Sequence, residues 1–355
     1  MCKNLLNSSF ELGSKSKNWA QLPEFIKKFI SAIHSQSFFD WKEVALEIYN
    51  WQRVSNPIYQ SFLKYLNKNH ELTDIEQIPF LPIQFFKSQD VKSGDFIPEL
   101  IFKSSGTTQQ QRSKHLVSDS LWYQTVSSTI FQKQFGPLKD SVVIALLPNY
   151  LAAGDSSLVY MANHFMQESA HSLNGFYLED YNSLKDKLKD AIKLNEKIIF
   201  IGVPYALIDF SAHFTFDNYN QLILIETGGM KGKRQEMSKE KLHRILKNNF
   251  NINTLYSEYG MTELLSQCYT TGKLSFQESS TMKIKITEIN DPFTKQKPRK
   301  TGQVNVIDLA NIFSCSFIQT GDLGIYDEHN QFEIIGRMNN AEIRGCNLLY
   351  ENIKG

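Results

Sequence analysis

The stretch KIIFIGVP at residues 197–204 is a short apolar run that ends in a glycine and a proline. Two similar runs flank it along the chain, SVVIALLP at 141–148 and QLILIET at 221–227. Continuous apolar runs of this length, alternating with stretches of helical periodicity, are typical of a parallel sheet that helices cover on both faces. The fold class is therefore predicted to be α/β with a mostly parallel sheet core. Ligands are expected beyond the carboxyl ends of its strands.

The segments on either side of this core differ in character. Apolar residues recur at three- and four-residue steps up to about residue 75, which predicts a helical N-terminal region. After residue 270 short or alternating apolar runs, among them GQVNVIDLA at 302–310, predict a small β-rich lobe. The predicted division is a helical region at 1–99, an α/β core at 100–271, a β-rich lobe at 272–335 and a hinge remnant with a C-terminal tail at 336–355.

Composition narrows the classes of function. Of the 355 residues, 41% are hydrophobic, so the chain has the material for a large core and is not wholly disordered. Lys and Arg number 38 against 37 Asp and Glu, so no global field attracts nucleic acid or anionic lipid, and no nucleic-acid partner is predicted. No apolar run approaches the ~20 residues that span a bilayer, and the N-terminus lacks a signal core. We therefore expect a soluble, cytoplasmic protein without a membrane span.

The cysteines give no metal site or disulfide framework. Cys2, Cys268, Cys315 and Cys346 have irregular separations and form no CxxC pair. The simplest reading is that each thiol is reduced and inert.

A polar loop follows the predicted strand at 101–102. Four hydroxyls surround one glycine there and can present donors to phosphate oxygens, while the glycine permits the positive φ of a tight anion-binding loop. The residues of this loop are Ser104, Ser105, Gly106, Thr107 and Thr108. Arg112, Lys114 and His115 follow and are expected to add positive charge. The alternative is an ordinary Ser/Thr turn, since no Walker GK[ST] is present.

Three further motifs lie downstream. Gly228 and Gly229 follow the predicted strand 221–227 and would let the backbone approach a planar ligand, or would simply connect a strand to a helix. The segment Tyr256–Glu263, YSEYGMTE, offers an aromatic face, a glycine, a hydroxyl and a carboxylate for Mg²⁺, or else a capped helix start. Asp322, in TGD, can accept two ribose hydroxyls or belong to a plain β-turn. Arg337 follows fifteen residues later, in GR.

The order of these motifs resembles the adenylate-forming superfamily. SSGTT, TGG, YGMTE, TGD and GR follow one another over about residues 100–345 as they do in acyl-CoA synthetases. The phrases FKSSGTT, LLPNYLAAGDSSLVYM, GVPYALIDF, TGGMKGKR and GRMNNAEIRGCNLL look more specifically like the acyl-protein synthetase family. That family supplies the fatty-acid ligase component of the bacterial bioluminescence fatty-acid reductase complex. The resemblance implies the large N-terminal domain of an adenylate-forming enzyme, and the usual C-terminal lid is expected to be absent.

The resemblance also implies roles for single residues. The loop Ser104–Thr108 would cradle the ATP phosphates, assisted by Arg112 or Lys114. Gly228, Gly229 and Gly260 would flank the nucleotide and acyl pockets, and Tyr259 would stack on adenine. Thr262 and Glu263 would handle phosphate and Mg²⁺, with Glu263 the metal ligand. Asp322 would hold the ribose hydroxyls, and Arg337 would lie near the ribose. Cys346 would accept the acyl group as a thioester.

The predicted function is therefore ATP- and Mg²⁺-dependent activation of a fatty or other carboxylic acid to acyl-AMP. Acyl transfer to a protein thiol follows, on Cys346 or on an acyl-accepting or reductase partner. Gln109–Gln111 depart from the usual Gly-x-Pro-Lys-Gly continuation of the phosphate loop, and Asn339 stands where an aspartate is usual. The alternatives are a phenylacetate-type CoA ligase, a silent nucleotide-binding subunit, or an acyltransferase that uses a serine such as Ser156.

Overall fold

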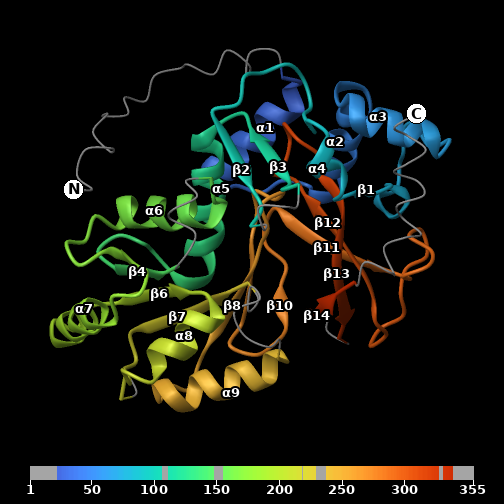
Figure 1. Ribbon diagram of the computed structural model, residues 1–355. Coiled ribbons are helices and arrows are strands. Elements are labelled where there is room, and N and C mark those ends of the chain that lie inside the picture. The colour runs from blue at the N-terminus through green and yellow to red at the C-terminus, as the bar shows by residue number, and fades with distance from the viewer. Residues whose placement is uncertain are drawn as a thin grey trace.

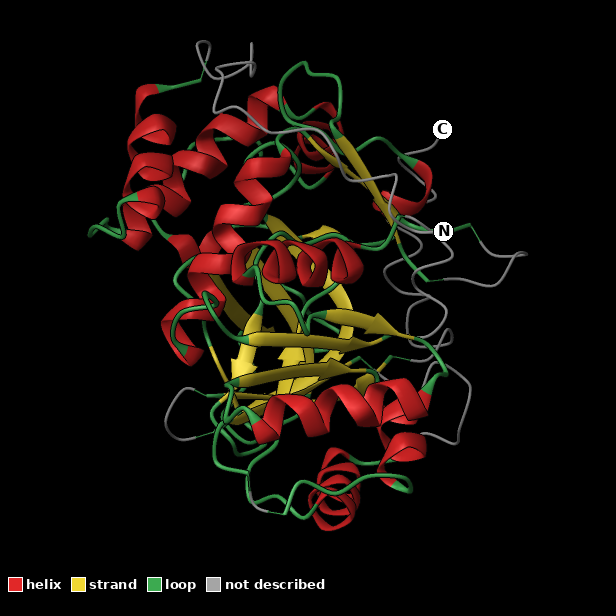
Figure 2. Cartoon of the chain, turned by 90° about the vertical axis from the view of Figure 1, so that its left-hand side faces the viewer, coloured by secondary structure: helices red, strands yellow, loops and turns green. Residues whose placement is uncertain are grey.

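A computed structural model describes residues 22–105, 111–147, 155–217, 219–228, 237–327 and 331–338. In these residues one large sheet lies between helices (Figures 1 and 2). The helices are α1 (Glu24–His34), α2 (Trp41–Ser55), α3 (Pro57–Tyr65), α4 (Phe85–Ser88), α5 (Ser120–Phe135), α6 (Ser157–Ser169), α7 (Tyr181–Lys193), α8 (Pro204–Ser211) and α9 (Lys239–Phe250), with a 3₁₀ turn η2 (Ile75–Gln77). No helix among the described residues has both the length and the apolar character needed to cross a membrane.

The strands form a twelve-stranded sheet and a separate hairpin. The hairpin pairs β2 (Leu100–Lys103) with β3 (Lys114–Val117). The sheet contains β1 (Leu81–Pro82), β4 (Val142–Leu146), β5 (Gly175–Tyr177), β6 (Ile198–Gly202), β7 (Leu222–Thr227), β8 (Tyr256–Tyr259), β9 (Cys268–Thr270), β10 (Phe276–Gln277), β11 (Met282–Thr287), β12 (Gly302–Asp308), β13 (Phe317–Tyr326) and β14 (Phe332–Arg337).

The predicted α/β class is confirmed, and the three apolar runs are neighbouring parallel strands. The order β5-β4-β6-β7-β8 is parallel throughout, and α6, α7, α8 and α9 connect these strands in turn. From β8 the sheet continues as antiparallel strands in the order β9-β10-β14-β13-β12-β11. The β-rich segment therefore extends the same sheet, and β8 is the strand at which its two halves meet.

Strand β6 shows why a strand inside this sheet has a continuous apolar sequence. Ile199 and Ile201 pack into one core with α5 and α6, whereas Ile198 and Phe200 pack into a second core with α7, α8 and α9. Successive side chains of a strand point to opposite faces, so a strand covered on both faces must be apolar at every position. Figure 2 shows helices on both sides of the strands.

The N-terminal helices dock against a distant part of the chain. Gln52 of α2 is fully buried, and its amide nitrogen donates to the carbonyl oxygens of Asn311 (3.1 Å) and Ile312 (2.8 Å). Its amide oxygen accepts from the backbone N–H of Ser316 (2.9 Å). These bonds satisfy the irregular backbone between β12 and β13, which supports the candidate site described below.

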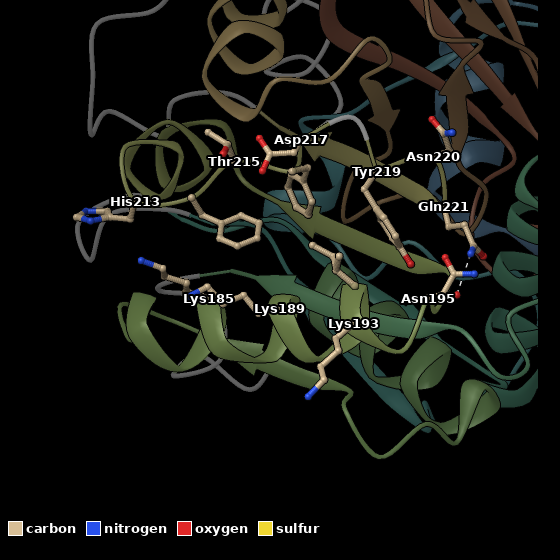
Figure 3. A pocket seen from close by; sticks show the side chains of 13 residues that line it. Lys185, Lys189, Lys193, Asn195, His213, Thr215, Asp217, Tyr219, Asn220 and Gln221 are labelled. Carbon is tan, nitrogen blue, oxygen red and sulfur yellow. Dashed lines mark hydrogen bonds between the residues drawn. The ribbon is translucent and has the colours of Figure 1, made fainter.

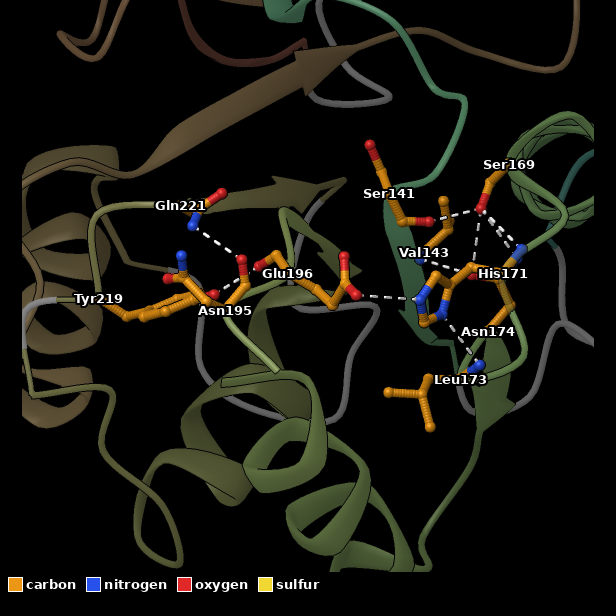
Figure 4. Close-up of polar contacts among 10 residues, drawn as sticks. All are labelled: Ser141, Val143, Ser169, His171, Leu173, Asn174, Asn195, Glu196, Tyr219 and Gln221. Atoms are coloured by element: carbon orange, nitrogen blue, oxygen red, sulfur yellow. Dashed lines mark hydrogen bonds and ion pairs between the residues drawn. The ribbon is translucent and has the colours of Figure 1, made fainter. Parts of the chain in front are cut away.

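A polar network secures the amino ends of the parallel strands (Figure 4). The side chain of Asn174 accepts from the backbone N–H of Val143 (2.8 Å) and donates to Ser169 Oγ (3.1 Å). Nearby, His171 Nε2 lies 3.7 Å from Glu196 Oε1. The network joins the ends of β4, α6 and α7 at the edge opposite the one where ligands are expected.

Candidate active site

A cavity of about 100 Å³ lies beyond the carboxyl ends of β7 and β8. It gathers side chains from segments far apart in the sequence, including four positions singled out by the motifs. Its lining residues are Lys103, Ser105, Tyr123, Ser156, Ser157, Leu158, Met161, Thr227, Gly228, Glu258, Gly260, Met261, Thr262 and Gln267. The residues among them to which the sequence assigned a role in the site are Ser105, Gly228, Gly260 and Thr262. The edge of the sheet predicted for ligand binding is therefore where these residues converge.

The beginning of the polar loop is fixed by the hairpin. The backbone N–H of Ser104 donates to the carbonyl oxygen of Ser113 (3.0 Å), and Ser104 Oγ accepts from the N–H of Ser113 (2.9 Å). This pairing extends the β2–β3 ladder by one step and directs Ser105 toward the cavity. The remaining predicted phosphate-binding residues, Gly106, Thr107 and Thr108, lie outside the described residues.

The cations after this loop contact carboxylates. Arg112 binds both carboxylate oxygens of Asp155, at 2.8 and 3.1 Å, and Lys114 forms an ion pair with Asp90. Lys103 Nζ lies 3.7 Å from the carboxylate of Asp155. Arg112 thus joins the hairpin to the segment that precedes α6. A phosphate role for Arg112 and Lys114 stays a prediction, and it would require these pairs to be shared or broken.

The expectation that His115 adds positive charge is wrong. Its ring is 1% exposed, and burial lowers its pKa from 6.5 to about 4. The ring is therefore neutral at pH 7, and Nδ1 bonds the carbonyl oxygen of Thr262 at 2.8 Å. The residues that precede His115 in the sequence are polar, and nothing in them indicates that strand β3 directs this ring into the core. Its role in the structure is to hold the backbone of the YGMTE motif.

This burial predicts a dependence of stability on pH. Because the folded pKa of His115 is about 4 and the unfolded value is 6.5, the unfolded chain binds the extra proton first as the pH falls. The contribution is intact above pH 6.5 and is lost as the pH falls from 6.5 toward 4. Between pH 7 and pH 5 the free energy of unfolding should fall by about 2 kcal/mol through this ring.

Urea unfolding of the wild type and of His115→Gln at the two pH values measures this effect. Gln retains an amide donor for the carbonyl of Thr262 but does not titrate. The pH dependence should therefore be about 2 kcal/mol smaller in the variant. Equal pH dependence in the two proteins would show that the ring does not carry the effect.

Two further side chains hold the YGMTE backbone in place. Asn311 Nδ2 donates to the carbonyl oxygen of Glu263 (2.7 Å), and Asp308 accepts from the backbone N–H groups of Leu265 (2.8 Å) and Ser266 (3.0 Å). Both lie in or after β12, far from the motif in sequence. The sequence motifs did not indicate these two residues, because their hydrogen bonds to this loop exist only after folding brings β12 next to it.

Thr262 and Glu263 are placed differently from each other. Thr262 lines the cavity, whereas Glu263 is 4% exposed and does not line it. Burial raises the pKa of the Glu263 carboxyl. The alternative of a helix start at this motif is wrong, because Tyr256–Tyr259 is strand β8 and a turn follows.

Tyr259, Asp322 and Arg337 form a cluster next to the cavity. The hydroxyl of Tyr259 donates to Asp322 Oδ2 (3.0 Å), and Arg337 Nε donates to Asp322 Oδ1 (2.9 Å). Asp322 lies inside β13 opposite Arg337 in β14, so the alternative of an isolated β-turn is wrong. The ring of Tyr259 is 7% exposed and packs edge-on against Phe276 and Phe332.

One carboxylate of the cavity was not assigned from the sequence. Glu258 of β8 pairs in register with Thr227 of β7, and the Thr227 hydroxyl donates to Glu258 Oε2. A Cβ on Gly260 would collide with Glu258 Oε1, so the glycine leaves room for this carboxylate. Glu258 stands within the motif YSEYGMTE, but alternation along a strand could not tell which face of the sheet it serves.

The remaining predicted site residues are not described. Gly229 and Cys346 lie outside the described residues, whereas Gly228, at φ 83°, is the last described residue before that gap. Cys268 and Cys315 are fully buried and free, and burial raises the pKa of both thiols, that of Cys315 to about 12. Neither is therefore a nucleophile in this fold. Ser156, the serine of the acyltransferase alternative, caps α6 and accepts a hydrogen bond from the backbone N–H of Val159.

A larger cavity of about 960 Å³ lies on the outer side of α7 (Figure 3). Its lining includes Lys185, Lys189 and Lys193 of α7 and the loop residues His213–Asp217 and Tyr219–Gln221. This loop precedes β7, so the cavity is away from the carboxyl ends of the strands. No motif residue lines it, and we assign the candidate active site to the smaller cavity.

Comparison with known proteins agrees with the fold and the motifs. The structure of ATP-bound MatB from Rhodopseudomonas palustris superposes with a TM-score of 0.53 at 17% identity, covering 68% of this chain and 49% of MatB. A 2-hydroxyisobutyryl-CoA ligase in complex with 2-HIB-AMP and CoA gives a TM-score of 0.61 at 13% identity, covering 90% and 70%. The chain thus spans about half the length of MatB, and the shared feature is the fold.

Comparison with curated protein sequences gives no match. The sequence model of the acyl-protein synthetase family, LuxE, matches residues 41–353, which is most of the chain. With the motif residues converging at one edge of an adenylate-forming fold, this match shows that the chain belongs to the LuxE acyl-protein synthetase family.

Proposed function

We propose that the protein activates a fatty acid with ATP to an acyl-adenylate and then transfers the acyl group to a protein thiol. The observation that carries the proposal is the convergence of Ser105, Gly228, Gly260 and Thr262 on one cavity beyond β7 and β8. Membership of the LuxE family supports the choice of acid activation among the reactions that such a cavity can host.

The residues of the cavity suit a nucleotide and a carboxylate substrate. Ser105 and Lys103 present a hydroxyl and a cation for phosphate oxygens, and the glycines allow the backbone to approach a flat ring. Asp322 retains acceptor capacity beyond its bonds to Tyr259 and Arg337, since a carboxylate has about four lone-pair sites. Its assigned role is to bind the ribose hydroxyls.

The chemistry required of the chain is mainly positioning. The substrate carboxylate attacks the α-phosphate, pyrophosphate leaves, and the mixed anhydride then donates its acyl group to a thiol. Mg²⁺, when bound, neutralises phosphate charge, and oxygen donors such as Thr262 and Glu263 are the type that it prefers. The loop backbone that His115 and Asn311 hold would keep these donors in place.

The decisive experiment is ATP–pyrophosphate exchange with a panel of acids from acetate through aryl acids to C16. Exchange driven by medium- or long-chain acids is the expected result. Exchange driven only by aryl acids would favour a phenylacetate-type ligase. Absence of exchange with every acid, despite ATP binding, would contradict the proposed activation step.

Substitution Cys346→Ser tests the thiol acceptor. If Cys346 accepts the acyl group, the variant should keep exchange within about twofold and lose hydroxylamine-sensitive labelling of the protein by radioactive fatty acid. Cys2→Ser is the matched control and should retain the label. Full labelling of Cys346→Ser would remove the residue from the mechanism.

A further inference from the structure

Glu258 is the only carboxylate among the described residues that line the candidate cavity. A site for ATP and a fatty-acid carboxylate is a costly place for a further negative charge, because like charges repel. One contact holds Glu258 there, and one neighbouring residue leaves room for it. Thr227 donates its hydroxyl to Oε2, and Gly260 has no side chain where a Cβ would collide with Oε1.

The acyl-transfer step needs a proton acceptor. A thiol with an ordinary pKa of about 8.5 is only a few per cent ionised at pH 7, so attack on the adenylate is faster if a base removes its proton. Of the other titratable side chains that line the cavity, Lys103 carries a positive charge and Tyr123 is a buried phenol whose pKa burial raises. His115, behind the loop, already uses Nδ1 on the carbonyl of Thr262.

We propose that Glu258 is the general base that takes the proton of the acceptor thiol during acyl transfer. The inference rests on the proposed function and assigns a catalytic residue to its second step. The S–H proton passes to the Glu258 carboxylate, the sulfur forms a bond to the acyl carbon, and the bond from that carbon to the AMP phosphate oxygen breaks. AMP leaves with the electron pair, and Glu258 later returns the proton to solvent.

The surroundings of Glu258 are compatible with this role. Tyr123 of α5 and Tyr269 of β9 lie close enough for its charge to contribute to raising their pKa values, so both stay neutral phenols. Lys103 of β2 lines the same cavity, with Asp155 near its ammonium group. Among the described residues, therefore, the groups facing Glu258 offer no competing base at neutral pH.

The test separates the two half-reactions. Chemically prepared acyl-AMP is mixed with enzyme and N-acetylcysteamine in the absence of ATP, and AMP release is followed from pH 6.5 to pH 9. ATP–pyrophosphate exchange is measured in parallel. Glu258→Gln is the informative variant because its amide oxygen still accepts the Thr227 hydroxyl, and Glu47→Gln, an exposed carboxylate of α2, is the control.

At pH 7 the Glu258→Gln variant should transfer the acyl group about 10- to 30-fold more slowly than the wild type, because a few per cent of the thiol is already ionised, and its exchange should fall much less than its transfer. Its deficit should shrink toward pH 9, because the thiol then ionises without a base. A deficit that stays constant with pH, equal losses in transfer and exchange, or unchanged transfer would each overturn the proposal. If the wild type shows no exchange while Glu258→Gln still slows transfer with this pH dependence, the result would support the base and refute ATP activation.

Discussion

Substitution of Asp322 by Ala should lower kcat/KM for ATP in the exchange reaction by about 10³-fold. The carboxylate is assigned two ribose hydroxyls, and a hydrogen bond to a charged acceptor contributes about 1.5–3 kcal/mol. Two such bonds correspond to about two to four powers of ten, since each 1.4 kcal/mol is tenfold. Steady-state exchange at varied ATP concentration measures the loss.

The geometry supplies controls for this prediction. Tyr259→Phe removes one donor to Asp322 but leaves the carboxylate and its bond to Arg337, so we expect less than a tenfold effect. Asp322→Asn keeps one acceptor and should fall between the two. If Asp322→Ala retains exchange while remaining folded by circular dichroism, Asp322 does not bind the ribose.

The parallel half of the fold was predictable because a strand that is buried on both faces of the sheet has a continuous apolar stretch in its sequence. Each of the runs at 141–148, 197–204 and 221–227 holds four or more consecutive apolar residues, and no other common arrangement requires this in several short segments. The continuity of the sheet into the antiparallel half was not predictable. It depends on β9 pairing with the free edge of β8, and neither strand carries a signal for its partner.

The site residues were predictable where the local motif alone places them at the cavity. They were not predictable where contacts with distant segments decide the charge or the position of a side chain. Gly228, Gly260 and Thr262 reach the cavity because short loops follow directly from strands. His115 has the right residue type, but burial keeps its ring neutral, and Arg112 pairs with Asp155, a partner that its own motif does not indicate. Sequence spacing gives no information about such partners, which come from segments dozens of residues away.

Asp308 is another residue whose contacts with a distant segment could not be predicted from the sequence. Its replacement is expected to lower the free energy of unfolding more than any other change proposed for this protein. Asp308 is fully buried, and its carboxylate accepts from the backbone N–H groups of Leu265, Ser266 and Ala310 and from Ser266 Oγ. Replacement by Ala leaves three buried N–H groups without this acceptor, each costing about 1–3 kcal/mol. The free energy of unfolding should therefore fall by about 3–5 kcal/mol, a large part of the 5–15 kcal/mol typical of a domain.

The loop that Asp308 holds begins directly after Glu263, so the same substitution should also impair the site. Urea unfolding followed by circular dichroism gives the stability, and ATP–pyrophosphate exchange at a temperature where the variant is folded gives the activity. Asp308→Asn has the same shape but turns an N–H₂ group toward backbone N–H donors, so about half of the destabilisation should remain. A loss below about 1 kcal/mol in Asp308→Ala would mean that water replaces the carboxylate and that the loop is held chiefly by Asn311 and His115.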